Sequence, residues 1–238
     1  MDTLDDFMKS RPATAARPLL GLTVLVVEDS RFASEALRLL CLRSGARIRR
    51  ADSLFHARRH LRVYRPTAVI VDLGLPDGSG ADLIAELSRG CPRVDILLAT
   101  SGDPGSEALA LAAGADGFIA KPIASLAQFQ AAVLDHMPRD RHPPGPRQIN
   151  NDEVSPDPIA YRDDLAQIAD VLSRDDQVGA LDYITQFLGG VARSAGDHPL
   201  SDAVDELAAS RSAGSPHRLH VARLAAMVQQ RLAPMGPL

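Results

Sequence analysis

Polar side chains that can bind a metal ion or a phosphoryl group stand at the ends of four short apolar runs in this sequence. Short apolar runs bounded by turn signals are typical of buried strands. The side chains in question are Glu28, Asp29, Asp72, Thr100 and Lys121. Since ligands of a doubly wound parallel sheet bind beyond the carboxyl ends of its strands, we expect these groups to converge.

The types of these residues fit a magnesium-dependent phosphoryl-acceptor site. Mg2+ prefers oxygen ligands, so Asp29 and Asp72 are expected to bind it directly, with Glu28 beside or behind them and the backbone carbonyl of Gly74 as a further ligand. Asp72 can then act as a nucleophile and form an acyl phosphate. The ammonium of Lys121 can pair with that carboxylate and later with phosphoryl oxygens. The hydroxyl of Thr100 can donate a hydrogen bond to a phosphoryl oxygen.

Each of these residues also has an ordinary structural interpretation. An acidic pair after a strand can cap a helix, and a lone Asp before a Gly/Pro turn often serves the turn. A Lys-Pro pair can be part of a plain loop, and Thr100 can cap the next helix. Their joint occurrence, in this order and at strand ends, favours the phosphoryl-acceptor site.

Strand and helix signals alternate five times between residues 21 and 137, which predicts an α/β fold: a doubly wound, five-stranded parallel sheet with helices on both faces. The expected strands are Thr23–Val27, Ala46–Arg50, Ala68–Val71, Asp95–Ala99 and Gly117–Ala120. The expected helices are Phe32–Arg43, Ser53–Val63, Ala81–Arg89, Gly105–Ala113 and Ser125–His136. Left-handed helix caps are expected at Gly45, Gly90 and Gly114.

Four segments make residues 21–137 resemble the receiver domain of bacterial two-component response regulators. These segments are Val24–Ser30, Val69–Gly78, Leu98–Ser101 and Ala113–Pro122. The resemblance implies the flavodoxin-like strand order 2-1-3-4-5, which is known from a chemotaxis receiver. It also implies that Asp72 receives a phosphoryl group from a histidine kinase or a phosphotransfer protein. The chain would then be a phospho-accepting signalling protein and not an enzyme in its own right.

The resemblance further assigns a switch role to Thr100 and Phe118, in which the hydroxyl moves toward the phosphoryl group and the ring rotates inward. The alternative for Phe118 is a plain core aromatic. Two positions depart from the family pattern, because Gly74 and Gly102 stand where larger or polar side chains are common. These positions flank the route of water to an acyl phosphate, so the sequence leaves its lifetime open.

Composition places the chain among ordinary soluble proteins of a reducing compartment. Apolar residues make up 45% and charged residues 24% of the 238 residues, and the net charge is -4. We predict that Cys41 and Cys91 are reduced and buried, which favours the cytoplasm. The longest apolar run is too short to span a bilayer, and the start of the chain is acidic, unlike a signal peptide.

The sequence predicts four parts: a leader (1–20), the receiver domain (21–137), a Pro-rich linker (138–158) and a helical output or dimerisation domain (159–238). The linker holds six prolines and is expected to be mostly extended. Helix starts are expected at Asp157-Pro158, Ser173 with Asp176, and Ser215-Pro216. Four apolar stripes predict a small bundle, or helices that bury their stripes against a second copy.

Three outputs remain open for the helical part. The first is a protein-interaction output, with a homodimer through the receiver or the helices. The second is nucleic-acid binding through a basic last helix, since Arg218, Arg223 and Arg231 lie in a stretch without acids. The third is a degenerate phosphotransfer bundle, because the stretch 188–196 resembles the sequence after the reactive histidine of such domains, with Gln186 at the histidine position and Gly189 at a lysine position.

Overall fold

A five-stranded parallel sheet forms the first half of the molecule. The computed structural model describes residues 12–145, 149–173, 181–214 and 216–233. The sheet has the order β2-β1-β3-β6-β7, which in order of the parallel strands is the predicted 2-1-3-4-5. Its strands are β1 (Thr23–Val27), β2 (Arg47–Ala51), β3 (Ala68–Asp72), β6 (Ile96–Ser101) and β7 (Gly117–Ala120). The two central strands β3 and β6 are buried along their whole length, as their continuous apolar sequence requires.

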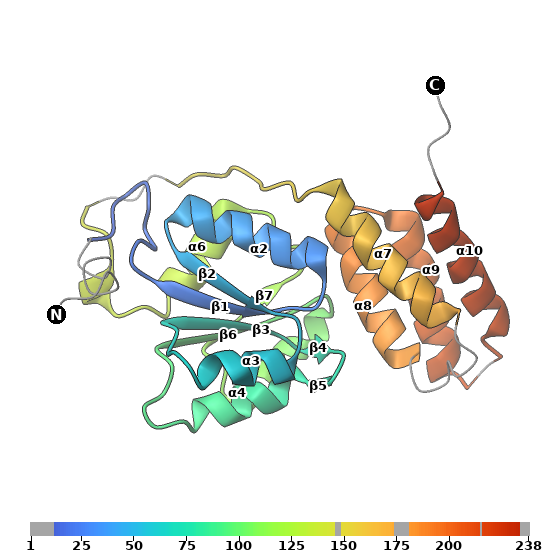
Figure 1. The fold of residues 1–238 in the computed structure, drawn as a ribbon, viewed down its shortest axis with the longest axis horizontal. Coiled ribbons are helices and arrows are strands. Elements are labelled where there is room, and N and C mark those ends of the chain that lie inside the picture. Colours follow the sequence, from blue (N-terminus) through green and yellow to red (C-terminus); the bar gives the residue numbers. More distant parts are fainter. Residues whose placement is uncertain (1–11, 146–148, 174–180, 215, 234–238) are drawn as a thin grey trace.

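Helices cover both faces of this sheet (Figure 1). α2 (Arg31–Ser44) and α6 (Leu126–Leu134) pack on one face. On the other face lie α3 (Leu54–Leu61), α4 (Gly80–Ser88) and α5 (Glu107–Ala113), the last preceded by the 3-10 turn η1 (Pro104–Ser106). A short hairpin of β4 (Gly74–Leu75) and β5 (Gly78–Ser79) follows β3. The predicted α/β architecture is confirmed, with element boundaries shifted by one or two residues.

Local sequence signals explain most of these helix boundaries, and one predicted helix cap is wrong. Serines accept a hydrogen bond from the first turn of four helices, α2, α3, α4 and α6. Gly45 and Gly114 adopt the left-handed cap conformation, as predicted. The predicted cap at Gly90 is wrong, because α4 ends at Ser88 and its cap residue is Arg89, in a right-handed conformation. The prediction for Cys41 holds, whereas Cys91 is exposed, since it lies in the loop after α4 and outside the core.

Four helices form a bundle in the second half: α7 (Pro158–Leu172), α8 (Leu181–Ser194), α9 (His198–Ser212) and α10 (Arg218–Leu232). Their apolar stripes bury one another in a core of their own. Asp157 caps α7 and Pro158 opens it, as the sequence predicted. The predicted helix starts at Ser173 with Asp176 and at Ser215-Pro216, and the first half of the leader, involve residues outside those the structure describes.

The segment between the two halves is extended but is not free of the receiver. After the 3-10 turn η2 (Arg139–Arg141), Glu153 forms a β-bridge with Ser125, and Val154 is buried in the core beside α6. The backbone N–H of Leu126 donates to Asp152 at 3.0 Å, and that of Val154 donates to Ala124 at 2.9 Å. Residues 152–154 of this segment are therefore bound to the receiver by backbone hydrogen bonds and by the buried side chain of Val154.

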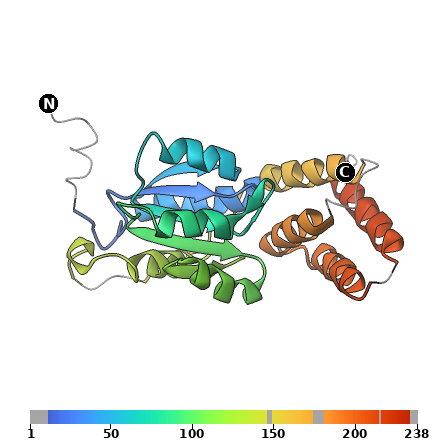
Figure 2. The ribbon, with the colours of Figure 1, turned by 90° about the horizontal axis from the view of Figure 1, so that it is seen from below.

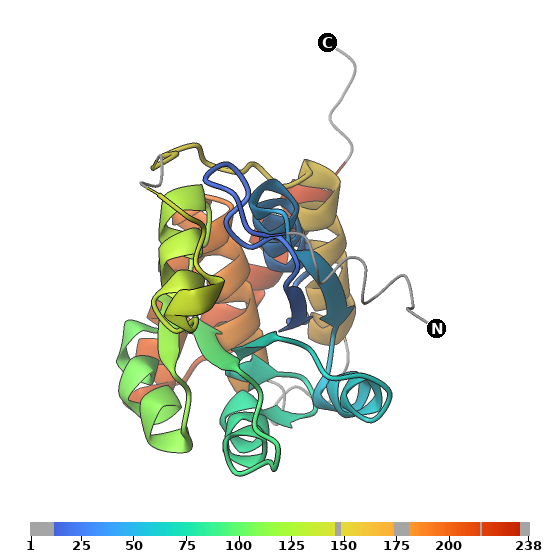
Figure 3. The same ribbon diagram turned by 90° about the vertical axis from the view of Figure 1, so that its left-hand side faces the viewer.

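The bundle lies beyond one end of the sheet (Figures 1 and 2). A view along the molecule places it behind the α/β half, with α7 and α8 nearest to the sheet (Figure 3). α7 and α8 both pack against α2, and α8 also packs against β4. Since β4 follows the carboxyl end of β3, the bundle lies at the carboxyl ends of the strands. This is where the sequence predicts the candidate site residues.

Candidate metal and phosphoryl-acceptor site

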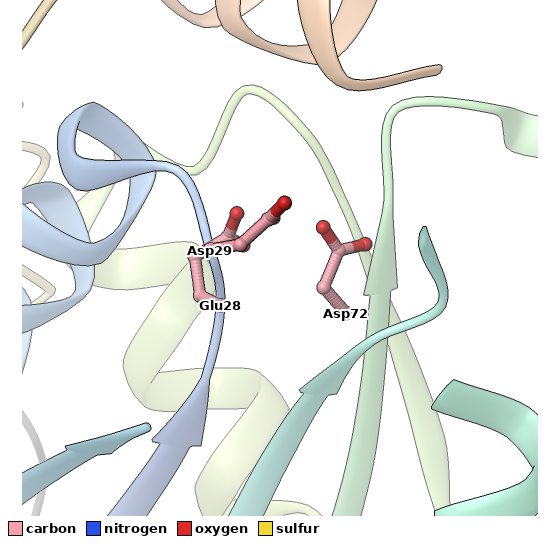
Figure 4. A group of neighbouring side chains, drawn as sticks. All are labelled: Glu28, Asp29 and Asp72. Atoms are coloured by element: carbon pink, nitrogen blue, oxygen red, sulfur yellow. The ribbon is translucent and has the colours of Figure 1, made fainter. Parts of the chain in front are cut away.

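Three carboxylates meet at the carboxyl ends of β1 and β3. These strands are parallel neighbours in which Val27 pairs with Val71, so the residues that follow β1 lie beside Asp72. Figure 4 shows the side chains of Glu28, Asp29 and Asp72 directed into the same space. All three are buried, and oxygens of the three lie within 4.8 Å of one another. The structure thus brings these three residues together.

Lys121 reaches the same group from the loop after β7. Its Nζ lies 2.8 Å from Asp72 Oδ2 and 2.7 Å from Glu28 Oε2, with only 6% of the side chain exposed. Burial by itself would lower the pKa of this ammonium, but the charges of Asp72 and Glu28 outweigh burial and raise the pKa. Lys121 is therefore held as a cation against the carboxylate of Asp72.

One ammonium does not balance three carboxylates, and the titration of the acids reflects this. Burial, followed by the charge of Asp72, raises the pKa of Asp29 to about 7. Burial is also the main cause that raises the pKa of Glu28, with Lys121 opposing it. Without a cation the site therefore favours protonated acids, and a bound cation would replace those protons.

The residues fit a bound divalent cation. Asp29 Oδ1 is buried and finds no hydrogen-bond partner within the described ranges of the chain. A buried carboxylate oxygen without a partner is costly unless an ion or solvent satisfies it. Glu28 is already engaged, since Oε2 pairs with Lys121 and Oε1 accepts from the backbone N–H of Ser30 at 3.3 Å. Asp29 and Asp72 would hold the ion directly, with Glu28 behind them.

The Thr100 hydroxyl bonds within the sheet, and the Phe118 ring packs against the core. Thr100 pairs with Asp72 across β3 and β6, and its fully buried hydroxyl donates to the carbonyl of Ile119 at 2.8 Å. Phe118 is half-buried against the core on the side of α3, α4 and α5. The backbone N–H of Gly74 donates to Asp72 Oδ1 at 3.3 Å.

The helical bundle contributes residues to this site that the sequence reasoning missed. The hydroxyl of Tyr183 in α8 donates to Asp29 Oδ2 at 2.8 Å. Asp164 in α7 is fully buried and accepts hydrogen bonds from the start of α2. The side chain of Gln186 lies against Gly74. A buried aspartate in the amphipathic pattern of α7 was the available signal, but its partners are 132 to 134 residues away in sequence.

Comparison with known proteins identifies the α/β half. The family model described as the response regulator receiver domain matches residues 24–133. Together with the strand order and the acidic group, this match shows that the chain contains a response regulator receiver domain. The match ends before the helical bundle.

Curated relatives match over the same part of the chain. The KDP operon transcriptional regulatory protein KdpE of Escherichia coli is 32% identical over 110 residues, which are 46% of this chain and 48% of that protein. The transcriptional regulatory protein KdpE of Mycobacterium tuberculosis is 35% identical over 113 residues, 46% of this chain and 50% of that protein. The chain thus spans about half the length of the curated relatives it matches.

A solved structure of a response regulator protein from Burkholderia pseudomallei, with a phosphorylated aspartic acid, a calcium ion and citrate, is 30% identical. It covers 47% of this chain and 66% of that chain, with a TM-score of 0.42. Among the described helices, none is long and apolar enough to cross a membrane.

Proposed function

We propose that this protein is a cytoplasmic response regulator in which Asp72 accepts a phosphoryl group from a histidine kinase or a phosphotransfer protein. The observation that carries the proposal is the buried group of three carboxylates with the ammonium of Lys121 at 2.8 Å from Asp72. A carboxylate oxygen of Asp72 would attack the phosphorus of a phosphohistidine. The bond between phosphorus and the histidine nitrogen breaks, its electron pair stays on the imidazole, and an acyl phosphate forms.

The other residues at the strand ends have distinct roles in this proposal. Asp29 and Asp72, with the backbone carbonyl of Gly74, would hold Mg2+, which offsets negative charge when the phosphate arrives. Lys121 moves from the carboxylate of Asp72 to the phosphoryl oxygens. Thr100 leaves the carbonyl of Ile119 and donates to the phosphoryl group, and Phe118 turns into the space that Thr100 vacates.

We also propose that the chain is divided as its sequence predicts, with a leader (1–20), a receiver domain (21–137), a linker (138–158) and a helical output domain (159–238). The output would be contact with another signalling protein or with a second copy of this chain. Support comes from the separate cores of the two halves.

A mass measurement tests the acceptor role. Full-length protein is incubated with Mg2+ and acetyl phosphate, and the intact mass and the phosphorylated peptide are determined. We expect one phosphoryl group on Asp72 and none on Asp72→Asn, while Asp82→Asn, a change at an exposed position in α4, stays at the wild-type level. Labelling of Asp72→Asn equal to that of the wild type would refute the proposal.

A DNA-binding output is the second candidate, favoured by the names of the relatives, which are transcriptional regulatory proteins. The structure offers it limited support, because three of the arginines pair with acids inside the bundle: Arg211 with Asp182, Arg223 with Glu206, and Arg231 with Asp197. Salt-dependent retention of the full chain on DNA, weakened by Arg218→Ala, would favour this candidate over the interaction output.

A further inference from the structure

Glycines let the bundle approach the acceptor site at two points. A Cβ atom on Gly74 would overlap the side-chain amide of Gln186, so a larger residue at position 74 would require that side chain to move. A Cβ atom on Gly102 would lie 3.3 Å from the Cα atom of Gly190 in α8. These glycines are the two departures from the receiver pattern seen in the sequence. In the structure both are places where α8 comes close to the receiver.

Specific polar contacts hold the bundle in this place. The carboxylate of Asp164 accepts from Ser30 Oγ at 2.7 Å, from the N–H of Arg31 at 2.8 Å and from the N–H of Phe32 at 3.0 Å. The first N–H groups of a helix have no partner within the helix, so α7 supplies the partner that α2 lacks. Tyr183 adds the hydrogen bond to Asp29. The receiver site and the bundle thus share buried hydrogen bonds that neither half can satisfy alone.

The space left over Asp72 is too small for a phosphoryl group. The cavity that touches Asp72, Gly74 and Lys121 has a volume of about 10 Å3 and is closed on the bundle side by Gln186, Phe187 and Gly190. A cavity of about 10–15 Å3 on this measure holds a single water molecule, whereas a phosphoryl group adds a phosphorus and three oxygens. Phosphorylation of Asp72 therefore requires α8 to move away.

A second opening reaches the acids but not Asp72. A groove of about 1360 Å3 runs past α2, α3 and α7 and is lined by Glu28 and Asp29 among others, but not by Asp72. Ions and water can enter along this groove while α8 stays in place. A donor that must bring phosphorus against Asp72 has to come through the side that α8 covers.

We infer that the helical bundle occupies, in cis, the face through which a phosphoryl donor reaches Asp72, and that docking of the bundle and phosphorylation of Asp72 exclude each other. This inference rests on the proposed function. The partner that fits the same face is a helix of a donor protein that presents a phosphohistidine where α8 presents Gln186. The third interpretation of the sequence, a phosphotransfer-like bundle with Gln186 at the histidine position, agrees with this placement.

The coupling is reciprocal. If the docked bundle destabilises the acyl phosphate at equilibrium, the acyl phosphate destabilises docking by the same free energy. The acyl phosphate would release α7 and α8, and their receiver-facing surfaces would become available to another protein. Asp164 and Tyr183 are positioning residues in this account, since they hold the cover and do not take part in phosphoryl transfer.

The experiment compares two adjacent aspartates of α7 in the full-length protein. Asp164→Ala removes the buried hydrogen bonds to the start of α2. Asp163→Ala removes an exposed ion pair with Arg31, which is also in α2. We measure the rate of phosphorylation by acetyl phosphate with Mg2+ and the amide exchange of Arg31 and Phe32. The amide of Ala33 is the internal control, because it bonds to Ser30 Oγ within the receiver.

We expect Asp164→Ala to be phosphorylated about tenfold faster, because the open, reactive state becomes about tenfold more populated. Its Arg31 and Phe32 amides should exchange faster, with Ala33 changed less and Asp163→Ala within about twofold of wild type, as for an exposed pair. Tyr183→Phe, which keeps the ring in place, is the second opening variant and should shift both readouts in the same direction. If Asp164→Ala does not fold, Tyr183→Phe alone tests whether the bundle restricts phosphorylation.

The outcomes separate the two proposals. If wild type and both opened variants all fail to take up phosphate, the proposed function is wrong. If all accept phosphate at Asp72 at the same rate, and the Arg31 and Phe32 amides of the phosphorylated wild type stay protected, the acceptor role stands and the inference about the bundle is overturned.

Discussion

The α/β half and the helical half of this molecule use their buried polar groups differently. Most buried polar side chains lie in the α/β half, where Glu28, Asp29, Asp72 and Thr100 gather at strand ends. In the described part of the bundle, the buried polar side chains are Asp164 and Ser201, and Asp164 is satisfied by the receiver. The α/β half thus holds its candidate reaction site within itself. The buried carboxylate of the helical half, Asp164, instead finds its hydrogen-bond partners in the α/β half.

This difference predicts opposite effects of core damage on stability and on phosphorylation. Leu188 is fully buried in the bundle core, and Leu188→Ala should lower the free energy of unfolding of the bundle by about 2–5 kcal/mol. The same change should speed phosphorylation of Asp72, because a loosened bundle covers it less. Chemical denaturation followed by fluorescence or circular dichroism, together with the phosphorylation rate, checks both effects.

Leu97 provides the matched change on the other side. Leu97→Ala damages the core between the sheet and α4, so it should lower both stability and phosphorylation. If both leucine variants slow phosphorylation equally, the bundle does not restrict phosphorylation of Asp72.

Removal of the ammonium should sharpen the assignment of roles within the receiver. Lys121→Ala takes away the cation at 2.8 Å from Asp72, which would otherwise stabilise the developing charge on the phosphoryl oxygens. We expect phosphorylation to slow by about 10²-fold, the size typical when one stabilising donor is lost from a site. Mg2+ affinity, measured by calorimetry, should not fall, because Lys121 is not a metal ligand. A loss of Mg2+ binding that equals the loss of rate would contradict these roles.

The sequence predicted the receiver well because its signals are local. A strand is read from four to six consecutive residues, and the polar residue that follows is then placed by the parallel register of β1, β3 and β6. Two of the three predicted glycine caps, Gly45 and Gly114, rest on equally local signals. The prediction failed at Gly90, where a glycine follows a helix without serving as its left-handed cap, and at Cys91, where an apolar residue lies in an exposed loop.

The contact between the halves could not be predicted in the same way. Tyr183 and Asp29 are 154 residues apart, and neither the spacing nor the type of Tyr183 distinguishes it from an ordinary helix residue. Gly74 and Gly102 were recognised as unusual, but their meaning depends on the approach of α8. Val154 likewise belongs to a Pro-rich stretch whose composition does not reveal that one side chain enters the receiver core.

The titration of Asp29 gives a smaller, graded test of the receiver site. Burial raises the pKa of Asp29 to about 7, so below that pH the carboxyl is protonated and a cation must displace the proton. Mg2+ affinity should therefore rise by about tenfold between pH 6 and pH 8, as expected when one competing group with a pKa near 7 is titrated. Calorimetry at several pH values checks this, and Asp29→Asn should show weak binding with a flatter dependence.

In the unphosphorylated protein the bundle covers Asp72, and we expect α7 and α8 to undock when Asp72 is phosphorylated. The most direct measurement is amide exchange at Arg31 and Phe32 in the full-length wild type, before and after phosphorylation, with Asp72→Asn treated in the same way. We expect slow exchange before phosphorylation, faster exchange afterwards, and no change in Asp72→Asn. Equal protection of both amides in the phosphorylated and unphosphorylated protein would contradict it.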